Sequence, residues 1–430
     1  MTETNQPKKL PGVPNQSFAT DIGSQNIHRN NAQKNPEKLK VLLLTWEYPP
    51  NIVGGLARHV YGLSRSLAKD QCEVYVITAK HPNSADYEVV DQVHVFRVNP
   101  LHEQEPNFLT WIAGLNLAMM TKASELFKQH QFNLIHAHDW LVGTAALLIK
   151  KQHNVPMLAT IHSTEHGRNN GIYTETQTFI HEKERQLIAG ADQIIVCSEY
   201  MKNEIGKLFF RNTDDLAIIA NGVDFEVAQP NQKAVVAGIP IDQQRRLIFS
   251  VGRIVKEKGF DTIIEAVPTL INNYPDLYFI IAGKGPMLEQ YHQLVNEKGL
   301  QHHIYFIGFI NDELKAQLFN QCELAIFPSL YEPFGIVALE SMAFGKPTIV
   351  AKTGGLTDII DHRKTGLFMM PGDRDSLIKG VELLLTQKDL ALTMGKNAQT
   401  VVLTEYSWDK IAKETKKIYE KCCKVKKLSI

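Results

Sequence analysis

Hydrophobic residues follow two alternating patterns along most of this chain. From Lys40 onward, short runs of consecutive apolar residues are separated by longer stretches in which apolar residues recur every three or four positions. Uninterrupted runs are typical of strands buried on both faces, and the longer pattern is typical of the amphipathic helices that cover them. The alternation therefore predicts an α/β fold built on parallel sheets. The first series of predicted strands covers residues 40–46, 73–78, 93–98, 134–137, 157–162 and 193–197.

A second series of the same kind begins after a break. Residues 223–245 show no period and include Pro230, Gly238 and Pro240, which indicates a linker. Because 430 residues exceed one ordinary core, we expect two doubly wound, Rossmann-like domains, over residues 39–222 and 246–404. The strands predicted for the second domain cover residues 247–252, 277–283, 303–308, 324–328 and 347–351.

The two ends of the chain have their own patterns. Residues 1–38 are polar and aperiodic, which predicts a disordered N-terminal arm. Residues 405–430 have a helical pattern and predict a C-terminal helix. The Cys422-Cys423 pair in this helix is followed by lysines, which leaves open a weak peripheral contact with a membrane.

Composition narrows the class of protein. The 46 Lys and Arg residues equal the 46 Asp and Glu residues, so no net charge favours nucleic acid or a membrane surface. No segment reaches the ~20 apolar residues that cross a bilayer, and the N-terminus has no secretory signal. The five cysteines lack metal-ligand spacing. We therefore expect a cytoplasmic protein with reduced thiols and no nucleic-acid partner.

The strongest chemical signal is the segment from Ser329 to Glu340, SLYEPFGIVALE. Its Pro-Phe-Gly turn precedes a predicted helix, and the first N–H groups of a helix are free to bind a phosphate. Glu332 would repel a phosphate, so we expect it to face a neutral group such as a sugar hydroxyl. The segment therefore predicts a site for a sugar nucleotide.

Other polar loops follow predicted strands, where open α/β sheets bind their ligands. Gly54-Gly55 would let the backbone approach a phosphate or sugar, although a tight turn explains the pair equally well. Arg253 and Lys258 on one loop could hold a diphosphate. Asp139 and His162 would contact sugar hydroxyls, the alternative being that they only cap helices.

Two patterns could be taken for metal sites. His136-Ala-His138-Asp139 and His162 offer ligand atoms, but no third cluster with ligand spacing accompanies them. Asp373-Arg-Asp375 precedes a predicted helix, and capping of that helix by Asp373 is a sufficient explanation. We therefore predict no metal and no other cofactor.

Together these motifs resemble those of the retaining glycosyltransferases of the GT-B fold, family 4 (group 1), close to the glycogen synthase-like members. The resemblance implies that the first domain binds a glycan acceptor and the second a nucleotide-sugar donor, across an interdomain cleft. It also implies that the C-terminal helix returns to the first domain. The residues that carry it are the Gly54-Gly55-Leu56 loop, His138-Asp139-Trp140, His162, the loop from Gly252 to Gly259, and Glu332-Pro-Phe-Gly with Glu340.

The resemblance implies two sets of site residues. The catalytic set is His162, Arg253, Lys258 and Glu332, and the donor-binding set is Gly54, Gly55, Asp139, Phe334, Gly335, Ile336, Val337 and Glu340. Ile52 stands where bacterial glycogen synthases carry a lysine, so the donor nucleotide stays open.

We expect transfer of a hexose, in the first instance glucose, to a glycan such as an α-glucan. The alternatives are another glycan, lipid or small-molecule acceptor, a nucleotide-sugar epimerase of the same fold, and a non-catalytic binding module. The sequence leaves the oligomeric state open.

Overall fold

The computed structural model describes residues 38–101, 107–224 and 245–427, together with residues 234, 236 and 239. Almost all of the predicted arm (1–38) and most of the predicted linker (223–245) lie outside the described residues.

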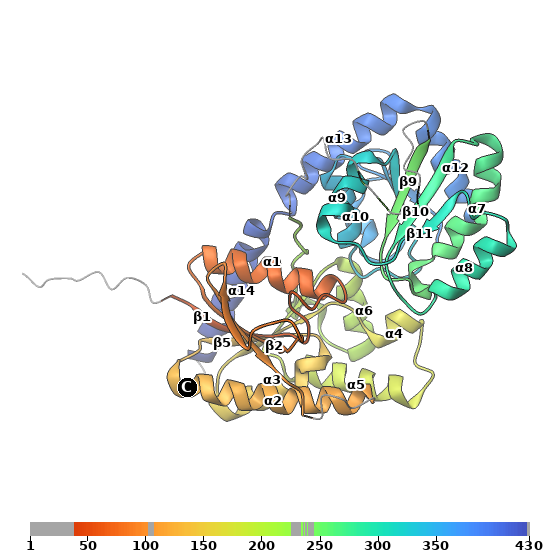
Figure 1. The fold of residues 1–430 in the computed structure, drawn as a ribbon. Coiled ribbons are helices and arrows are strands. Elements are labelled where there is room, and N and C mark those ends of the chain that lie inside the picture. The colour runs from red at the N-terminus through yellow and green to blue at the C-terminus, as the bar shows by residue number, and fades with distance from the viewer. Residues whose placement is uncertain are drawn as a thin grey trace, which may run out of the picture. The chain divides into compact units, whose positions relative to one another are not determined.

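The first sheet has eight strands in the order β3-β4-β2-β1-β5-β6-β7-β8 (Figure 1). All neighbouring strands are parallel except β3 and β4, which form an antiparallel pair. The sequence pattern missed β3 because its residues alternate between exposed and half-buried, and it missed the three-residue β8. The strands are β1 (Lys40–Leu44), β2 (Glu73–Ala79), β3 (Tyr87–Val90), β4 (Val93–Val98), β5 (Leu134–His138), β6 (Met157–Ile161), β7 (Gln193–Val196) and β8 (Leu216–Ile218).

Helices cover both faces of this sheet, as the buried strands require. In β1, Val41 and Leu43 pack into one apolar cluster with residues of α1, whereas Leu42 and Leu44 pack into another with residues of α2 and α3. This alternation follows from the two-residue period of a strand. The helices are α1 (Gly55–Lys69), α2 (Phe108–Gln129), η1 (Trp140–Val142), α3 (Gly143–His153), α4 (Glu165–Asn169), α5 (Glu175–Gly190), α6 (Glu199–Phe209) and η2 (Thr213–Asp215).

The second sheet has six parallel strands in the order β11-β10-β9-β12-β13-β14. The five predicted strands are present; β9 is shifted by one residue and the other four are slightly shorter than predicted, and β14 was not predicted. The strands are β9 (Arg246–Val251), β10 (Leu277–Ala282), β11 (Ile304–Phe306), β12 (Leu324–Phe327), β13 (Thr348–Ala351) and β14 (Leu367–Met369). The helices are η3 (Lys256–Lys258), α7 (Phe260–Asn273), α8 (Leu288–Glu297), α9 (Asp312–Gln321), α10 (Ile336–Ala343), α11 (Leu356–Ile359), α12 (Arg374–Thr386) and α13 (Lys388–Glu405).

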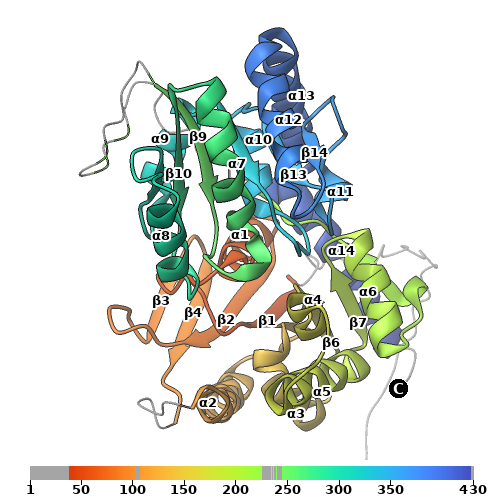
Figure 2. The same cartoon turned by 90° about the vertical axis from the view of Figure 1, so that its right-hand side faces the viewer.

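The last helix, α14 (Trp408–Lys427), leaves the second domain and packs on the first sheet beside α1 (Figure 2). Its Trp408 ring lies where a Cβ on Gly62 would come within 2.1 Å of it. Ile411, Ala412 and Tyr419 join the same apolar cluster as Val41 and Leu43. The final helix is therefore part of the first domain's core.

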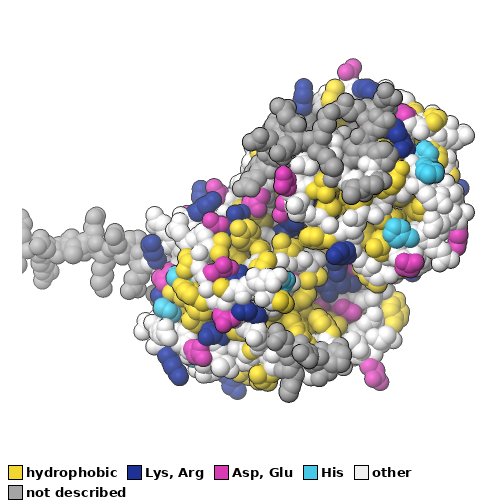
Figure 3. Space-filling view, in the orientation of Figure 1, with side chains coloured by type: hydrophobic (Ala, Val, Ile, Leu, Met, Phe, Trp, Pro, Cys, Tyr) yellow, Lys and Arg dark blue, Asp and Glu magenta, His cyan; other side chains and the backbone are white. Residues whose placement is uncertain are grey.

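Charged side chains of both signs are interspersed over the face shown in Figure 3. This mixture matches the equal numbers of basic and acidic residues in the sequence. Among the described residues, no helix is long and apolar enough to cross a membrane. Asp373 is the N-cap of α12, and its Oδ1 accepts hydrogen bonds from the N–H groups of Asp375 and Ser376 at 2.9 and 3.0 Å, which confirms the capping prediction.

Candidate active site

The predicted phosphate-binding turn lies between β12 and α10. Gly335 is the N-cap of α10 and has a φ of 112°, a conformation that favours glycine. A Cβ at this position would also come 2.6 Å from Cδ2 of Leu356. The turn therefore requires glycine on both counts. It presents the first N–H groups of α10, which have no partner within the helix, beyond the carboxyl edge of the sheet.

Glu332 and Lys258 meet beside this turn. Lys258 Nζ donates to Glu332 Oε2 at 2.5 Å, and Ser329 Oγ donates to the same oxygen at 3.1 Å. Glu332 is 7% exposed and Lys258 is half-buried, so the ion pair is partly shielded from water. The loops are held together because Gly259, with a φ of 64°, leaves room for the carbonyl oxygen of Pro328. Two residues that the sequence placed in the site are therefore in direct contact.

Glu340 lies within α10 and has a partner that the sequence did not indicate. Lys315 of α9 donates to Glu340 Oε1 at 2.6 Å, and Oε2 is buried with no hydrogen-bond partner among the described residues. Arg58 of α1 contributes a further positive charge and pairs with Asp312 of α9 at 2.7 Å. Lys315 and Arg58 each lie among other charged or polar residues of an amphipathic helix, so no local signal distinguished them.

Arg253 is the more exposed of the two predicted cations. Its nearest ion-pair partner is Glu257, with Nη2 to Oε1 at 3.5 Å. The guanidinium is therefore held only loosely and can turn toward a ligand.

The Gly54-Gly55 loop is shaped by Glu47, which is almost fully buried. Its carboxylate accepts hydrogen bonds from the N–H groups of Val53 at 2.6 Å, Gly54 at 3.1 Å and Ala57 at 3.3 Å. A Cβ on Gly55 would lie 3.1 Å from Cδ1 of Ile336, whereas one on Gly54 would meet nothing within 4 Å. This loop of the first domain therefore abuts the start of α10 in the second.

Asp139 and His162 are joined at the carboxyl ends of β5 and β6. Asp139 Oδ1 accepts the backbone N–H of His162 at 2.7 Å, so one carboxylate oxygen holds the backbone that presents the imidazole. Burial raises the pKa of Asp139 to about 6, against the opposing effect of Arg168. Burial also lowers the pKa of His162 to about 3, which keeps that ring neutral near pH 7.

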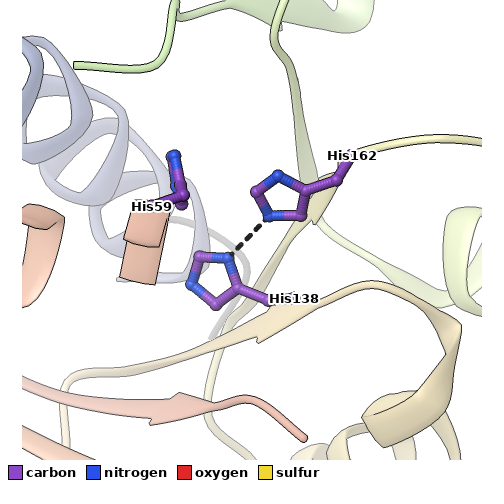
Figure 4. Close-up of side chains that lie close together, drawn as sticks. All are labelled: His59, His138 and His162. Carbon is purple, nitrogen blue, oxygen red and sulfur yellow. Dashed lines mark hydrogen bonds between the residues drawn. The ribbon is translucent and has the colours of Figure 1, made fainter. Parts of the chain in front are cut away.

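Two further imidazole rings, those of His138 and His59, lie beside His162 (Figure 4). His138, the last residue of β5, places Nδ1 3.2 Å from Nε2 of His162. His59 of α1 has its ring centroid 4.7 Å from that of His162. Sequence reasoning missed His59 because it lies on a helix far from both strands in the chain.

Comparisons with known proteins show the family to which this chain belongs. Residues 53–227 match the family described as Glycosyltransferase Family 4, and residues 231–401 match Glycosyl transferases group 1. An uncharacterized glycosyltransferase of Methanocaldococcus jannaschii is 34% identical over 89% of this chain and 98% of its own length. This chain belongs to family 4 of the glycosyltransferases. A glycogen synthase of Mycobacterium tuberculosis is 30% identical over 89% of this chain and 94% of its own.

The fold agrees with this family. The structure of sucrose-phosphate synthase from Thermosynechococcus elongatus superposes with a TM-score of 0.77 and 23% identity, covering 89% of this chain and 99% of that one. The family 4 chain is a GT-B protein with two Rossmann-like domains, as predicted. The roles of its individual site residues stay predictions.

The other predicted donor-binding residues of this glycosyltransferase lie at the start of α10. Phe334 is buried in the core, near the ring of Tyr406, so only its backbone is available to a ligand. Ile336 and Val337 are half-buried. The turn is thus surrounded by apolar side chains, the first N–H groups of α10, and the Glu332–Lys258 and Glu340–Lys315 pairs. Together these groups can bind a ligand that is anionic and carries hydroxyl groups.

Proposed function

We propose that the chain transfers glucose from a nucleotide-sugar to an α-glucan acceptor with retention of configuration. The observation that carries the proposal is the partly buried Glu332–Lys258 pair beside the start of α10. A donor diphosphate would draw Lys258 away from Glu332 and would also receive Arg253 and the N–H groups of Ile336 and Val337. The released Glu332 carboxylate would then accept hydrogen bonds from sugar hydroxyls.

The remaining residues would orient the two substrates. Glu340, with its unpartnered Oε2, would accept a ribose hydroxyl. Neutral His162 would hydrogen-bond the transferred sugar, positioned by Asp139 through its backbone N–H. Gly54 has open space at its Cα, so the loop backbone could approach the phosphates.

The chemical step would take place on one face of the sugar. The bond from the anomeric carbon to the phosphate oxygen breaks while the acceptor hydroxyl oxygen bonds to the same face. The acceptor proton passes to the departing phosphate oxygen. Lys258, Arg253 and the helix N–H groups would stabilise the charge that develops on that phosphate. We propose that no metal takes part, because two cations are present to do this.

The glycogen synthase relative supports the α-glucan acceptor and glucose as the transferred sugar. We propose a cytoplasmic location, where such donors and acceptors occur together. We propose that the domain over residues 39–222 binds the acceptor, that the domain over residues 246–404 binds the donor, and that a linker joins them.

Transfer from ADP-, UDP- and GDP-glucose to glycogen tests the proposal. We expect transfer from at least one donor, and a loss of about 10²-fold in kcat for Lys258→Ala, the size typical of removing one charge-stabilising group. Lys256→Ala, an exposed lysine on the same turn, is the matched control and should keep wild-type activity. Absence of nucleotide release with every donor and acceptor offered would overturn the proposal, and so would equal activity of the two lysine variants.

A further inference from the structure

Three histidines of the first domain converge from separate elements. His59 comes from the first turns of α1, His138 ends β5, and His162 follows β6 (Figure 4). One ring nitrogen of each lies within 4.8 Å of the ring nitrogens contributed by the other two. In tetrahedral coordination with Zn–N bonds of about 2.1 Å, two ligand nitrogens lie about 3.4 Å apart. Ring movements of about an ångström would therefore bring all three into coordination distance.

Two of the rings carry buried nitrogens with no hydrogen-bond partner among the described residues. His59 Nδ1 lies 2.6 Å from Oδ1 of Asn221, which can only accept, so this nitrogen bears the proton and Nε2 keeps a lone pair. His59 Nε2 is buried without a partner, and so is His138 Nε2. Leaving such a group unsatisfied is unfavourable, and a bound ligand would remove that cost for His59.

The state and composition of the cluster determine which ligand it could bind. Burial lowers the pKa of His59 and of His138 well below its ordinary value, so both imidazoles are neutral, the form that binds metals. No carboxylate or thiol belongs to the cluster. A set of imidazole nitrogens favours Zn²⁺, Cu²⁺, Ni²⁺ or Co²⁺ over Mg²⁺ and Ca²⁺.

We propose that His59, His138 and His162 bind one transition-metal ion of the Zn²⁺ class, with the fourth position left for water. His59 would bind through Nε2, oriented by the hydrogen bond from its Nδ1 to Asn221. His138 and His162 would bind through the nitrogens that now lie 3.2 Å apart. Whichever of the two rings carries the proton at that contact moves it to its opposite nitrogen, so metal binding releases no proton from the chain. The ion would enter beside His162, which is the only one of the three that is not fully buried.

The site has a consequence for transfer that rests on the proposed function. An imidazole whose Nε2 binds a metal ion cannot also use that nitrogen for a sugar hydroxyl. The metal ion and the donor sugar would therefore compete for His162, and Zn²⁺ would inhibit a transferase that needs no metal.

Calorimetric titration of the full chain with Zn²⁺ alone tests the binding. We expect one ion per chain, at least 100-fold weaker binding in His59→Gln, and 10- to 100-fold weaker binding in Asn221→Ala, which removes only the group that orients His59. His302→Gln, an exposed histidine of the second domain, is the control and should bind as wild type does. No binding, or equal binding by wild type and His59→Gln, would overturn the proposal.

Co²⁺ spectroscopy of the wild-type chain keeps the test valid if His59→Gln fails to fold. We expect the strong visible absorption of four-coordinate Co²⁺ without a thiolate charge-transfer band. A thiolate band would place the ion at cysteines instead and would overturn the site. These measurements use no sugar donor, so they stand whether or not transferase activity is found. Where transfer is found, binding of Zn²⁺ without inhibition would overturn the part played by His162.

Discussion

Glu184 is a buried carboxyl group that supports the loop carrying His162. Its Oε1 accepts the backbone N–H of Glu165 at 2.8 Å, at the start of α4, while Oε2 is buried without a hydrogen-bond partner among the described residues. Burial raises the pKa of Glu184 to about 8, despite the opposing effects of that N–H and of Arg168. The nearby His181 Nδ1, 3.7 Å from Oε2, does not offset the burial. At neutral pH the group therefore holds its proton.

The raised pKa of Glu184 should make the stability of the folded chain depend on pH. The pKa of Glu184 is higher in the folded chain than the ordinary value of 4.5, so the folded state binds more protons between pH 4.5 and about 8. Its contribution to the free energy of unfolding is complete below pH 4.5 and is lost as pH rises through 8. We expect Glu184→Gln to raise the melting temperature at pH 9 by several degrees relative to wild type, and to change it little at pH 5. Thermal melts at both pH values measure this.

The control for that prediction is Glu175→Gln, an exposed residue of the same helix. It should shift the melting temperature by a similar small amount at both pH values. If Glu184→Gln also gave equal shifts at pH 5 and pH 9, the buried protonated carboxyl group would be refuted.

Among the elements, the strands were the most predictable and the contacts between helices the least. Runs such as Val41 to Leu44 are wholly apolar because both faces of the sheet are covered, and that pattern is local. The strand β3 is exposed and carries no such run, whereas β8 and β14 are apolar but only three residues long, too short to be recognised from a local pattern. The same reasoning applies to the site. Glu332 and Lys258 lie on loops at strand ends, where position alone indicated them, whereas His59 and Lys315 reach the site from helix faces that only the packing of the fold brings there.

The packing of α14 on α1 predicts an inverted effect of a glycine substitution. Ala at an exposed helix position is usually about 1 kcal/mol more stable than Gly. At Gly62, however, a Cβ would lie 2.1 Å from Cε2 of Trp408. We expect Gly62→Ala to lower the free energy of unfolding by about 1–3 kcal/mol because of overpacking. Urea denaturation measures the change.

A double-mutant cycle tests the cause. Trp408→Ala alone should cost about 3–5 kcal/mol, since it empties a buried aromatic site. In the Trp408→Ala background, Gly62→Ala should become neutral or stabilising, because the clash is gone. The same penalty in both backgrounds would mean that the two elements do not pack as described.

At the scale of the whole molecule, several contacts between the domains lie around Glu332, in the segment predicted to bind the donor. Tyr331, next to Glu332, donates from its hydroxyl to Glu204 Oε1 of α6 at 3.0 Å and accepts the backbone N–H of Thr164 at 3.4 Å. A Cβ on Gly167 would come 2.4 Å from the Tyr331 ring. Nearby, Ser198 Oγ donates to the carbonyl oxygen of Pro333 at 2.7 Å. The first domain thus holds the backbone on either side of Glu332.

We therefore expect Tyr331→Phe to weaken donor use without preventing folding. Loss of a hydrogen bond to a charged group costs about 1.5–3 kcal/mol, which corresponds to a rise of about tenfold or more in KM for the donor. Steady-state kinetics with varied donor and fixed acceptor measure it. Tyr305→Phe, whose hydroxyl donates to the carbonyl oxygen of His302 away from the first domain, should leave KM unchanged. An unchanged donor KM in Tyr331→Phe would show that this contact does not support the site.

The return of α14 also constrains how the chain can fold during synthesis. Roughly 340 residues separate the end of α1 from the start of α14, although both complete one apolar cluster. At about 5–20 residues per second, a ribosome needs on the order of half a minute to add that length. Once β8 (Leu216–Ile218) has been made, the nascent first domain has its strands but still lacks the helix that covers one face. The core of the first domain can therefore be completed only after the second domain has been synthesised. Until then, we expect its uncovered apolar face to be accessible to chaperones.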